Sequence, residues 1–412
     1  MNSKLKFKQT EIGLIPEDWE VDKIGNVAKF QYGLGESAEK EGDYVYLRIT
    51  DISQDNTLNK TGLMYINKNK VKENYILSKG DVLVARTGAT FGKTLIFNED
   101  FKATYGGFLI KFLFDKNLIN SRFFFHYTRS NNYWHQANNL VNGGAQPQFN
   151  ANTISELYIP IPPIQEQSVI AKILSDLDSK IELLQKQNET LEKIGQAIFK
   201  QWFVDFEFPN EESNPYKSSG GKMVESELGE IPKGWSVGKL CNIFKIVYGK
   251  NLPTDKLKED GFPVFGGNGL IGFFDKYIYD KPQVIIACRG AASGKINFTL
   301  PNSFVTNNSL IIENDNSKVK FNYLKHYSLN SINFEDYVTG SAQPQITIEN
   351  LRSIDIMIPE LNILNLFDKI LDINEKKILL NQKEIKNLQK TRDLLLPKLM
   401  TGKIRVPLEV QK

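Results

Sequence analysis

Cationic and hydroxyl side chains gather at two glycine-rich turns of this sequence. In the first turn they surround two glycines: Arg86, Thr87, Thr90 and Lys93 lie around Gly88 and Gly92. The second turn has a similar set: Arg289, Ser293 and Lys295 lie around Gly290 and Gly294. Such groups form hydrogen bonds with phosphates and base edges, so the turns indicate nucleic-acid contact. Glycine turns also serve hairpin geometry alone, and that alternative stays open for each side chain.

The two turns correspond residue by residue, but their side chains differ. Arg86 aligns with Cys288, and Thr87 aligns with Arg289. A shared scaffold with different side chains is expected if two copies read different sequences. Five more polar residues are candidates for DNA contact: Arg48, Gln146, Gln148, Gln343 and Gln345. The glutamines could read adenine edges, but their position near a helix boundary favours a structural turn.

Motifs of known catalytic and nucleotide-binding sites are incomplete. Residues 267–272 match the dinucleotide GxGxxG pattern, but a strand-like run follows where a helix must begin, so we predict a hairpin. The Gly88 turn is one residue too short for a phosphate-binding loop. Asn214-Pro215-Tyr216 lacks one proline of the adenine methyltransferase motif. An unfamiliar site built from dispersed carboxylates stays open.

Histidine and cysteine are too few to build a catalytic set or a metal site. The chain has three histidines and two cysteines, Cys241 and Cys288, without metal-ligand spacing. We therefore expect no catalysis, no cofactor, no structural metal and no disulfide.

The elements that hold these turns occur twice in the chain. Residues 13–19 (GLIPEDW) return as 229–235 (GEIPKGW), and the later landmarks return in the same order. A chain of 412 residues agrees with two repeats of roughly 200 residues each. The duplication predicts a pseudo-two-fold molecule, which suits a ligand with two similar faces such as duplex DNA.

Each repeat begins with short β-type runs, such as 44–49 and 284–288, and ends in a helix after a proline. The first helix carries a heptad seam: Ile170, Leu174, Leu177, Ile181, Leu184, Asn188, Leu191 and Ile198. The second carries the same pattern: Phe367, Leu371, Asn374, Ile378, Asn381, Ile385, Leu388 and Leu395. The seams predict an intramolecular antiparallel coiled coil. The asparagines either fix its register or face solvent at a frayed stretch.

An aromatic stripe and a polar segment follow the first helix. The stripe has helical spacing: Phe199, Trp202, Phe203 and Phe206. It indicates either docking onto the chain's own globular part, which is the favoured interpretation, or a surface for a partner protein. Residues 209–222 are rich in proline, glycine, serine and asparagine, which predicts a flexible linker.

Composition is that of an ordinary soluble protein, with 41% hydrophobic and 24% charged residues. No run approaches the roughly 18 apolar residues of a membrane helix, and no apolar segment follows the N-terminal lysines, so we expect a cytoplasmic protein without a membrane partner. The net charge of +3 is too small to prove a polyanionic partner. Basic residues are concentrated between Lys383 and Arg405, where a solvated helix face is the simpler explanation.

The joint pattern resembles the specificity subunit of type I restriction-modification systems. Two Gly-x-Ile-Pro-x-x-Trp entries, two long helices and the tail 391–406 (TRDLLLPKLMTGKIRV) carry the resemblance. It implies a mixed α+β fold: a tandem pseudo-two-fold repeat of two target-recognition domains, each followed by a long helix, with the helices paired as an antiparallel coiled coil. The expected division is 1–160 and 225–359 for the domains, 161–208 and 360–412 for the helical spacers and tail, and 209–224 for the linker.

The resemblance further implies a non-catalytic subunit that reads a split target on double-stranded DNA. Its implied partners are two methyltransferase subunits and two ATP-driven restriction subunits, and its paired helices act as a ruler for the unread spacer. Two alternatives stay open. One is a DNA-binding or scaffold protein outside restriction, which would bind DNA without a methyltransferase. The other is an enzyme that uses Lys93 or Lys295 at the glycine turns.

Overall fold

The computed structural model describes residues 6–141, 149–313, 319–340 and 342–407. The chain divides into two compact units, residues 1–184 with 384–412, and residues 185–383. Each unit holds one repeat together with one half of each long helix. Among the described residues, no helix is long and apolar enough to cross a membrane.

The described residues of the first unit form one four-stranded sheet, one three-stranded sheet and two strand pairs. The sheets have the orders β4-β10-β7-β8 and β6-β5-β9, and the pairs are β1-β2 and β3-β11. The strands are β1 (Phe7–Thr10), β2 (Gly13–Pro16), β3 (Glu20–Lys23), β4 (Ala28–Tyr32), β5 (Tyr44–Leu47), β6 (Tyr65–Ile66), β7 (Val82–Ala85), β8 (Thr94–Ile96), β9 (Ala103–Tyr105), β10 (Leu109–Phe114) and β11 (Tyr158–Ile161). The short helices are α1 (Ile24–Val27), α2 (Ser121–Tyr127), α3 (Asn131–Val141) and α4 (Ala151–Ser155).

The second unit repeats this plan. Its sheets have the orders β15-β21-β18-β19 and β17-β16-β20, and its pairs are β12-β13 and β14-β22. The strands are β12 (Met223–Ser226), β13 (Gly229–Pro232), β14 (Ser236–Lys239), β15 (Lys245–Tyr248), β16 (Phe262–Gly266), β17 (Gly269–Phe274), β18 (Val284–Ala287), β19 (Ile296–Phe298), β20 (Phe304–Val305), β21 (Ser309–Glu313) and β22 (Asp355–Ile358). The short helices are α6 (Leu240–Ile243) and α7 (Phe321–Asn330). The matching sheet orders confirm the duplication. Residues 267–272 lie in the β16–β17 hairpin, as predicted, and not in a dinucleotide-binding turn.

One inner strand of each larger sheet is buried on both faces. Strand β7 reads Val-Leu-Val-Ala and β18 reads Val-Ile-Ile-Ala, and all eight residues are buried. Such continuous β-branched and aliphatic runs are typical of strands covered on both sides. These two strands lead directly into the two glycine turns, so each turn is attached to a fully buried strand of its unit.

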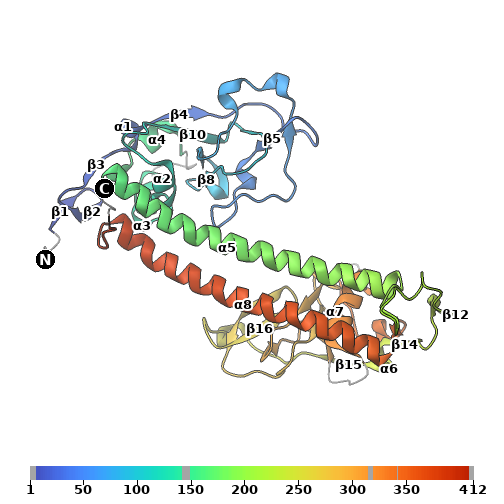
Figure 1. Ribbon diagram of the computed structural model, residues 1–412. Helices are drawn as coiled ribbons and strands as arrows, with labels where there is room; N and C mark the ends of the chain where they lie inside the picture. The colour runs from blue at the N-terminus through green and yellow to red at the C-terminus, as the bar shows by residue number, and fades with distance from the viewer. Residues whose placement is uncertain (1–5, 142–148, 314–318, 341, 408–412) are drawn as a thin grey trace. The chain divides into compact units, whose positions relative to one another are not determined.

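Two long helices, α5 (Ile164–Phe199) and α8 (Leu361–Met400), begin just after the prolines that end β11 and β22 (Figure 1). Antiparallel pairing is found inside each unit. In the first unit, Asp178 contacts Arg392 at 2.9 Å and Lys180 contacts Glu384 at 3.7 Å. In the second, the ring centroids of Phe199 and Phe367 are 6.3 Å apart. All predicted seam residues are buried or half-buried, which confirms the coiled coil.

The seam asparagines do not face solvent at a frayed end. Asn381 is fully buried, and its Nδ2 donates to Oδ1 of Asn188 at 2.9 Å. Asn374 is half-buried, and its Nδ2 has no acceptor among the described atoms. The polar layer is therefore inside the seam, as the register interpretation requires.

The aromatic stripe lies in the core of the second unit. Phe199, Trp202 and Phe203 are buried there, and the Phe203 ring centroid is 4.9 Å from that of Phe367. Phe206 is half-buried and packs against Trp235 at 5.8 Å. The interpretation of this stripe as a partner surface is therefore wrong, because its large apolar area is already buried within the chain.

The segment after α5 is folded, not a flexible linker. Its backbone forms hydrogen bonds such as Asn210 N to Asn214 O at 2.9 Å and Tyr216 N to Phe208 O at 2.9 Å. The Phe208 ring stacks on Trp235 with centroids 5.0 Å apart. Proline and glycine in this segment therefore serve tight turns, a use that composition alone does not separate from flexibility.

The C-terminal tail completes the first unit. Leu399, Met400 and Val406 belong to the same core as Trp19. The Arg405 guanidinium bridges two carboxylates, Asp18 at 2.7 Å and Glu166 at 2.7 Å. Residues at the two ends of the chain are thereby joined in one compact unit.

Candidate nucleic-acid interface

The first glycine turn joins β7 to β8 through the short 3-10 helix η4 (Gly88–Thr90). The Gly92 amide donates to Ala85 O at 2.8 Å and closes the turn. Gly92 has a φ of 74°, and an added Cβ would lie 3.2 Å from the Trp134 ring. Glycine is required here by both conformation and space.

The second glycine turn repeats this geometry between β18 and β19. The Gly294 amide donates to Ala287 O at 2.9 Å, and Gly294 has a φ of 88°. An added Cβ there would lie 3.0 Å from the backbone of Glu335. The two turns are thus one scaffold used twice, and only the side chains that they carry can distinguish their ligands.

Arg86 lies between two exposed aromatic rings at the start of the first turn. Its Cζ is 5.4 Å from the ring centroid of Tyr32 and 5.6 Å from that of Phe108. These rings are 40% and 57% exposed, although large aromatic side chains are usually covered. The Arg86 Nε is buried and has no acceptor among the described atoms. We call these three residues the Arg86 clamp.

The second unit has the same backbone arrangement without the arginine. The Arg86 amide donates to Phe108 O at 3.0 Å, and the Cys288 amide donates to Asn308 O at 2.9 Å. Cys288 is buried and Asn308 is exposed. Tyr248 is exposed, as is its counterpart Tyr32. The alignment of Arg86 with Cys288 is therefore confirmed.

Two of the predicted cations are occupied within the first unit. Arg48 donates to the Asp51 carboxylate from Nε at 3.1 Å and from Nη2 at 2.7 Å, and Asp51 is buried. Lys93 donates to the backbone oxygen of Gln54 at 3.3 Å and to its side-chain oxygen. Because its guanidinium is held by a buried carboxylate, Arg48 stabilises the loop after β5.

The predicted hydroxyl residues are half-buried or buried. Thr87 immediately precedes η4 and is half-buried, and the Thr90 hydroxyl donates to Ile49 O at 3.4 Å. Ser293 is buried, and its hydroxyl donates to Pro344 O at 2.8 Å. Ser293 therefore holds the second turn against the segment around Pro344, and its hydroxyl does not face solvent.

The glutamine turn of the second unit lies against the second glycine turn. The Gly290 amide donates to Pro344 O at 2.9 Å, and Arg289 and Gln345 form an isolated backbone bridge. Arg289, Lys295, Gln343 and Gln345 are all exposed. Arg289 and Gln345, which share this bridge, are therefore exposed neighbours. Gln146 and Gln148 lie outside the described residues.

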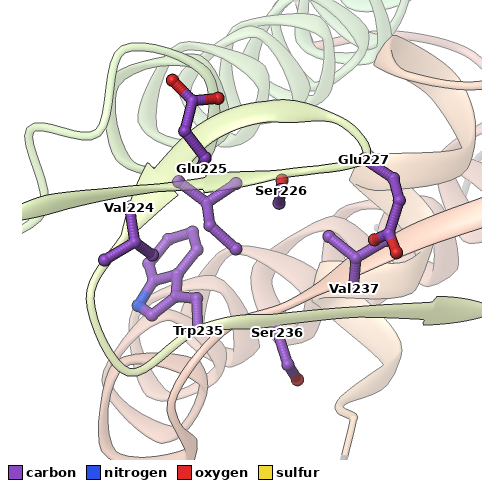
Figure 2. A pocket seen from close by; sticks show the side chains of 8 residues that line it. Val224, Glu225, Ser226, Glu227, Trp235, Ser236 and Val237 are labelled. Carbon is purple, nitrogen blue, oxygen red and sulfur yellow. The ribbon is translucent and has the colours of Figure 1, made fainter.

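A shallow hollow of about 550 Å³ lies beside the hairpin β12–β13 in the second unit (Figure 2). It is lined by Val224, Glu225, Ser226, Glu227, Ile231, Trp235, Ser236 and Val237. Two carboxylates and no cation line it, so it would repel a polyanion. The hollow is therefore unsuited to contact with phosphates.

The buried histidines belong to the framework. His126 and His326 occupy equivalent positions on α2 and α7, and burial lowers their pKa values to about 3 and about 4. His126 Nε2 is 3.0 Å from Ser175 Oγ on α5. In the described ranges, no group of three His, Cys, Asp or Glu side chains could hold a metal ion.

Two sets of residues were missed in the sequence. Tyr32 and Phe108 are exposed aromatics beside glycines, and that combination could have marked them. Three exposed apolar residues occur at intervals of seven on α8: Leu366, Ile373 and Leu380. They lie outside the predicted seam, and their spacing could have been found by testing each heptad position separately.

The chain is similar to known proteins along nearly its whole length. The family model described as "Type I restriction modification DNA specificity domain" matches residues 16–193 and 232–390. The MjaIX specificity subunit of a type I restriction enzyme of Methanocaldococcus jannaschii is 30% identical, with 97% of each chain covered. A putative specificity subunit of the same organism, MjaX, is also 30% identical with 97% of each chain covered.

A crystal structure supports the fold. The S subunit of a type I restriction-modification system from M. genitalium aligns with a TM-score of 0.63 over 97% of each chain, at 19% sequence identity. At that identity the likeness concerns the fold alone.

Proposed function

The chain belongs to the family of type I restriction-modification DNA specificity proteins, and from this premise we propose that it is the DNA-recognition subunit of such a complex. In this role it reads a bipartite target on double-stranded DNA and positions methyltransferase subunits there. The observation that carries the proposal is the repeated glycine-turn scaffold, which presents Arg86 in one unit and has a buried cysteine, Cys288, at the equivalent position of the other. Two similar scaffolds with different side chains fit a target with two different halves.

The subunit has no catalytic role in this proposal. Its contribution is binding: cations orient each domain on phosphates, and side chains at the turns reach base edges. Residues 1–160 and 225–359 serve as the two recognition domains, and residues 161–208 and 360–412 serve as the spacer between the half-sites. The DNA that it reads places its action in the cytoplasm.

The proposed partners are two methyltransferase subunits and, in the larger complex, two restriction subunits. Leu366, Ile373 and Leu380 support a protein contact on α8, because exposed apolar residues in a row mark interaction surfaces. We assign this row to a methyltransferase subunit.

A charge introduced into this row should weaken that assembly. Ile373 and Leu380 are 67% and 63% exposed, so Ile373→Lys with Leu380→Lys leaves the fold intact. Co-purification with the methyltransferase subunit should fall at least tenfold. Asn365→Lys with Gln382→Lys, which adds the same charge at exposed polar positions of α8, should leave it unchanged. Equal co-purification of both variants would remove the assignment.

The function is tested by mapping N6-methyladenine across a host genome by single-molecule sequencing. The chain is co-expressed with the methyltransferase subunit of its system, and the same strain without the chain is the control. A split motif that depends on the chain supports the proposal. Methylation that is absent, or identical without the chain, contradicts it and favours a DNA-binding or scaffold protein outside restriction.

A further inference from the structure

We propose that Arg86, held between Tyr32 and Phe108, reads a guanine in the half-site bound by the first domain. This inference rests on the proposed function and names one base contact within it.

The Arg86 guanidinium lacks the partner that most arginines of the chain have. Five arginines form ion pairs with carboxylates in the described structure: Arg48, Arg129, Arg352, Arg392 and Arg405. No carboxylate pairs with Arg86 within the described ranges, and its buried Nε finds no acceptor there. A buried donor without an acceptor carries a cost of roughly 1–3 kcal/mol. An external acceptor would remove that cost.

The two aromatic rings orient the guanidinium before any ligand binds. Cations within about 6 Å of an aromatic ring centroid are attracted to it, and here one guanidinium has two such rings. The Arg86 backbone is fixed as well, because its amide donates to Phe108 O at 3.0 Å and its carbonyl accepts from Phe149 N at 3.1 Å. Restricted rotation reduces the entropy lost on binding.

A planar guanidinium can bind a guanine edge or a phosphate with two hydrogen bonds, and the aromatic rings beside Arg86 favour the base. Guanine presents O6 and N7 side by side in the major groove, and a guanidinium donates to both. The mobile point charge of a lysine is enough for a phosphate contact, so such a contact does not require a guanidinium held by aromatic rings. The exposed Phe108 ring adds an apolar surface that can contact a thymine methyl group or a neighbouring base. The combination indicates base reading at this position.

The test compares methylation motifs of variants in the co-expression strain. Arg86→Ala and Arg86→Lys should both relax the motif at one guanine of one half-site, since lysine keeps the charge but not the fork. Discrimination at that base should fall roughly 5-fold to 150-fold, as for loss of one bidentate contact. The other half-site should stay unchanged.

Two matched controls separate base reading from general effects. Arg122→Ala removes a charge from an exposed arginine of the same unit whose side chain contacts Asn98 at 3.4 Å. Cys288→Ala changes the equivalent position of the second unit. Both should leave the motif unchanged. Phe108→Leu opens the clamp while keeping Arg86, and partial relaxation at the same guanine is expected.

Other outcomes overturn the inference. Weaker binding of all sequences by Arg86→Ala, with a lower salt dependence and an unchanged motif, would assign Arg86 to a phosphate. An unchanged motif and unchanged binding would exclude both roles. If Arg86→Ala does not fold, Arg86→Lys and Phe108→Leu provide the test, because an unchanged methylation motif in both variants would exclude the proposed contact between Arg86 and guanine. Absence of any chain-dependent motif in the wild type is a different result, which defeats the proposed function itself.

Discussion

Asp178 on α5 fixes the first recognition domain to both long helices. Its carboxylate accepts from Arg129 at 2.6 Å, just after α2, and from Arg392 of α8 at 2.9 Å. Burial would raise the Asp178 pKa, but the charge and hydrogen bonds of the two arginines lower it below its usual value. The second unit has a similar three-way contact, in which Lys325 bridges Glu375 at 2.7 Å and Glu192 at 3.4 Å.

Asp178→Asn should destabilise the first unit by roughly 1–3 kcal/mol, because Arg129 loses its counter-charge and Arg392 is left with the more exposed Asp393. Urea unfolding at pH 7 measures the change. Asp176→Asn on the same helix is the control, since Asp176 is exposed and pairs with Lys172 in the preceding turn; its effect should stay below about 0.5 kcal/mol. Equal effects of the two substitutions would contradict the anchoring role of Asp178.

His126 should make stability fall as the solution becomes acidic. Burial lowers its pKa to about 3, whereas an unfolded histidine has a pKa of about 6.5. Between these values the unfolded state binds a proton that the folded state does not, so the free energy of unfolding decreases as the pH falls. From pH 7 to pH 5, His126→Gln should lose about 2 kcal/mol less stability than the wild type.

Urea unfolding at both pH values measures this difference. His135→Gln, at an exposed histidine on α3, is the control and should keep the wild-type pH dependence. A wild-type slope in His126→Gln would show that acid sensitivity arises elsewhere.

The sequence indicated where the glycine turns lie, but not which of the candidate side chains are held by other groups of the protein. Arg48 and Arg86 look alike as candidates, yet one is held by a buried carboxylate three residues away and the other lies between two aromatic rings. The Asp51 partner of Arg48 is visible in the sequence at that spacing. The Phe108 ring is 22 residues from Arg86, and only the strand order brings the two together.

At the scale of elements, the asparagine pair in the seam fixes how α5 and α8 align. In the observed register the Asn381 amide donates to Asn188, and a shift by one heptad would place Asn381 opposite Ile181 or Gly195 instead. An unpaired buried amide costs roughly 1–3 kcal/mol. The polar pair therefore selects one alignment over its neighbours.

Replacing both asparagines by leucine should remove this selection. Asn188→Leu with Asn381→Leu keeps an apolar seam, so the chain stays folded, but shifted registers become accessible. Methylation mapping should then show the same half-sites with more than one spacer length. Ile378→Leu, a conservative change in the same seam, should keep a single spacer. One spacer length in the double variant would assign the register to other contacts.

Helix positions were predictable because their signals are local and repeated. The prolines and the heptad spacing placed α5 and α8 and their seam correctly. The aromatic stripe was ambiguous because helical spacing shows which residues share a face, not what covers that face. Residues 209–222 were misjudged as flexible for a related reason, since turn-forming residues are also those of linkers.

At the scale of the whole molecule, lengthening the two long helices should change only the number of unread base pairs between the half-sites. The boundary between the compact units falls after Leu184 in α5 and after Lys383 in α8. Seven residues inserted at both points, in phase with the seam, would leave the contacts inside each unit unchanged. Each helix would gain about 10 Å.

Methylation mapping should show both half-sites preserved and the spacer lengthened, by at most about three base pairs at 3.4 Å per pair. Three residues inserted at the same points are the control, because they break the heptad phase and should reduce methylation instead. A change in the bases read by either half would contradict the separation of reading from spacing.

The duplication was predictable because its landmarks recur in order. Which residues make up each compact unit was not predictable. Sequence similarity divides the chain into consecutive repeats. The packing instead joins residues 384–407 to the first repeat, through Leu399, Met400 and Arg405. Such long-range closure depends on side-chain contacts between distant segments, which one sequence does not reveal.

This closure sets an order of events during synthesis on the ribosome. Residues 185–383 emerge together and can fold as soon as they are complete, whereas Trp19 and Ile15 must wait for Leu399 and Val406. The segment 185–383, about 200 residues, is translated between the first repeat and its C-terminal cover, which takes roughly 10–40 s. During this time the apolar surface of the first repeat lacks its final cover, so a nascent-chain chaperone has the longest opportunity to act on the part of the protein that is made first.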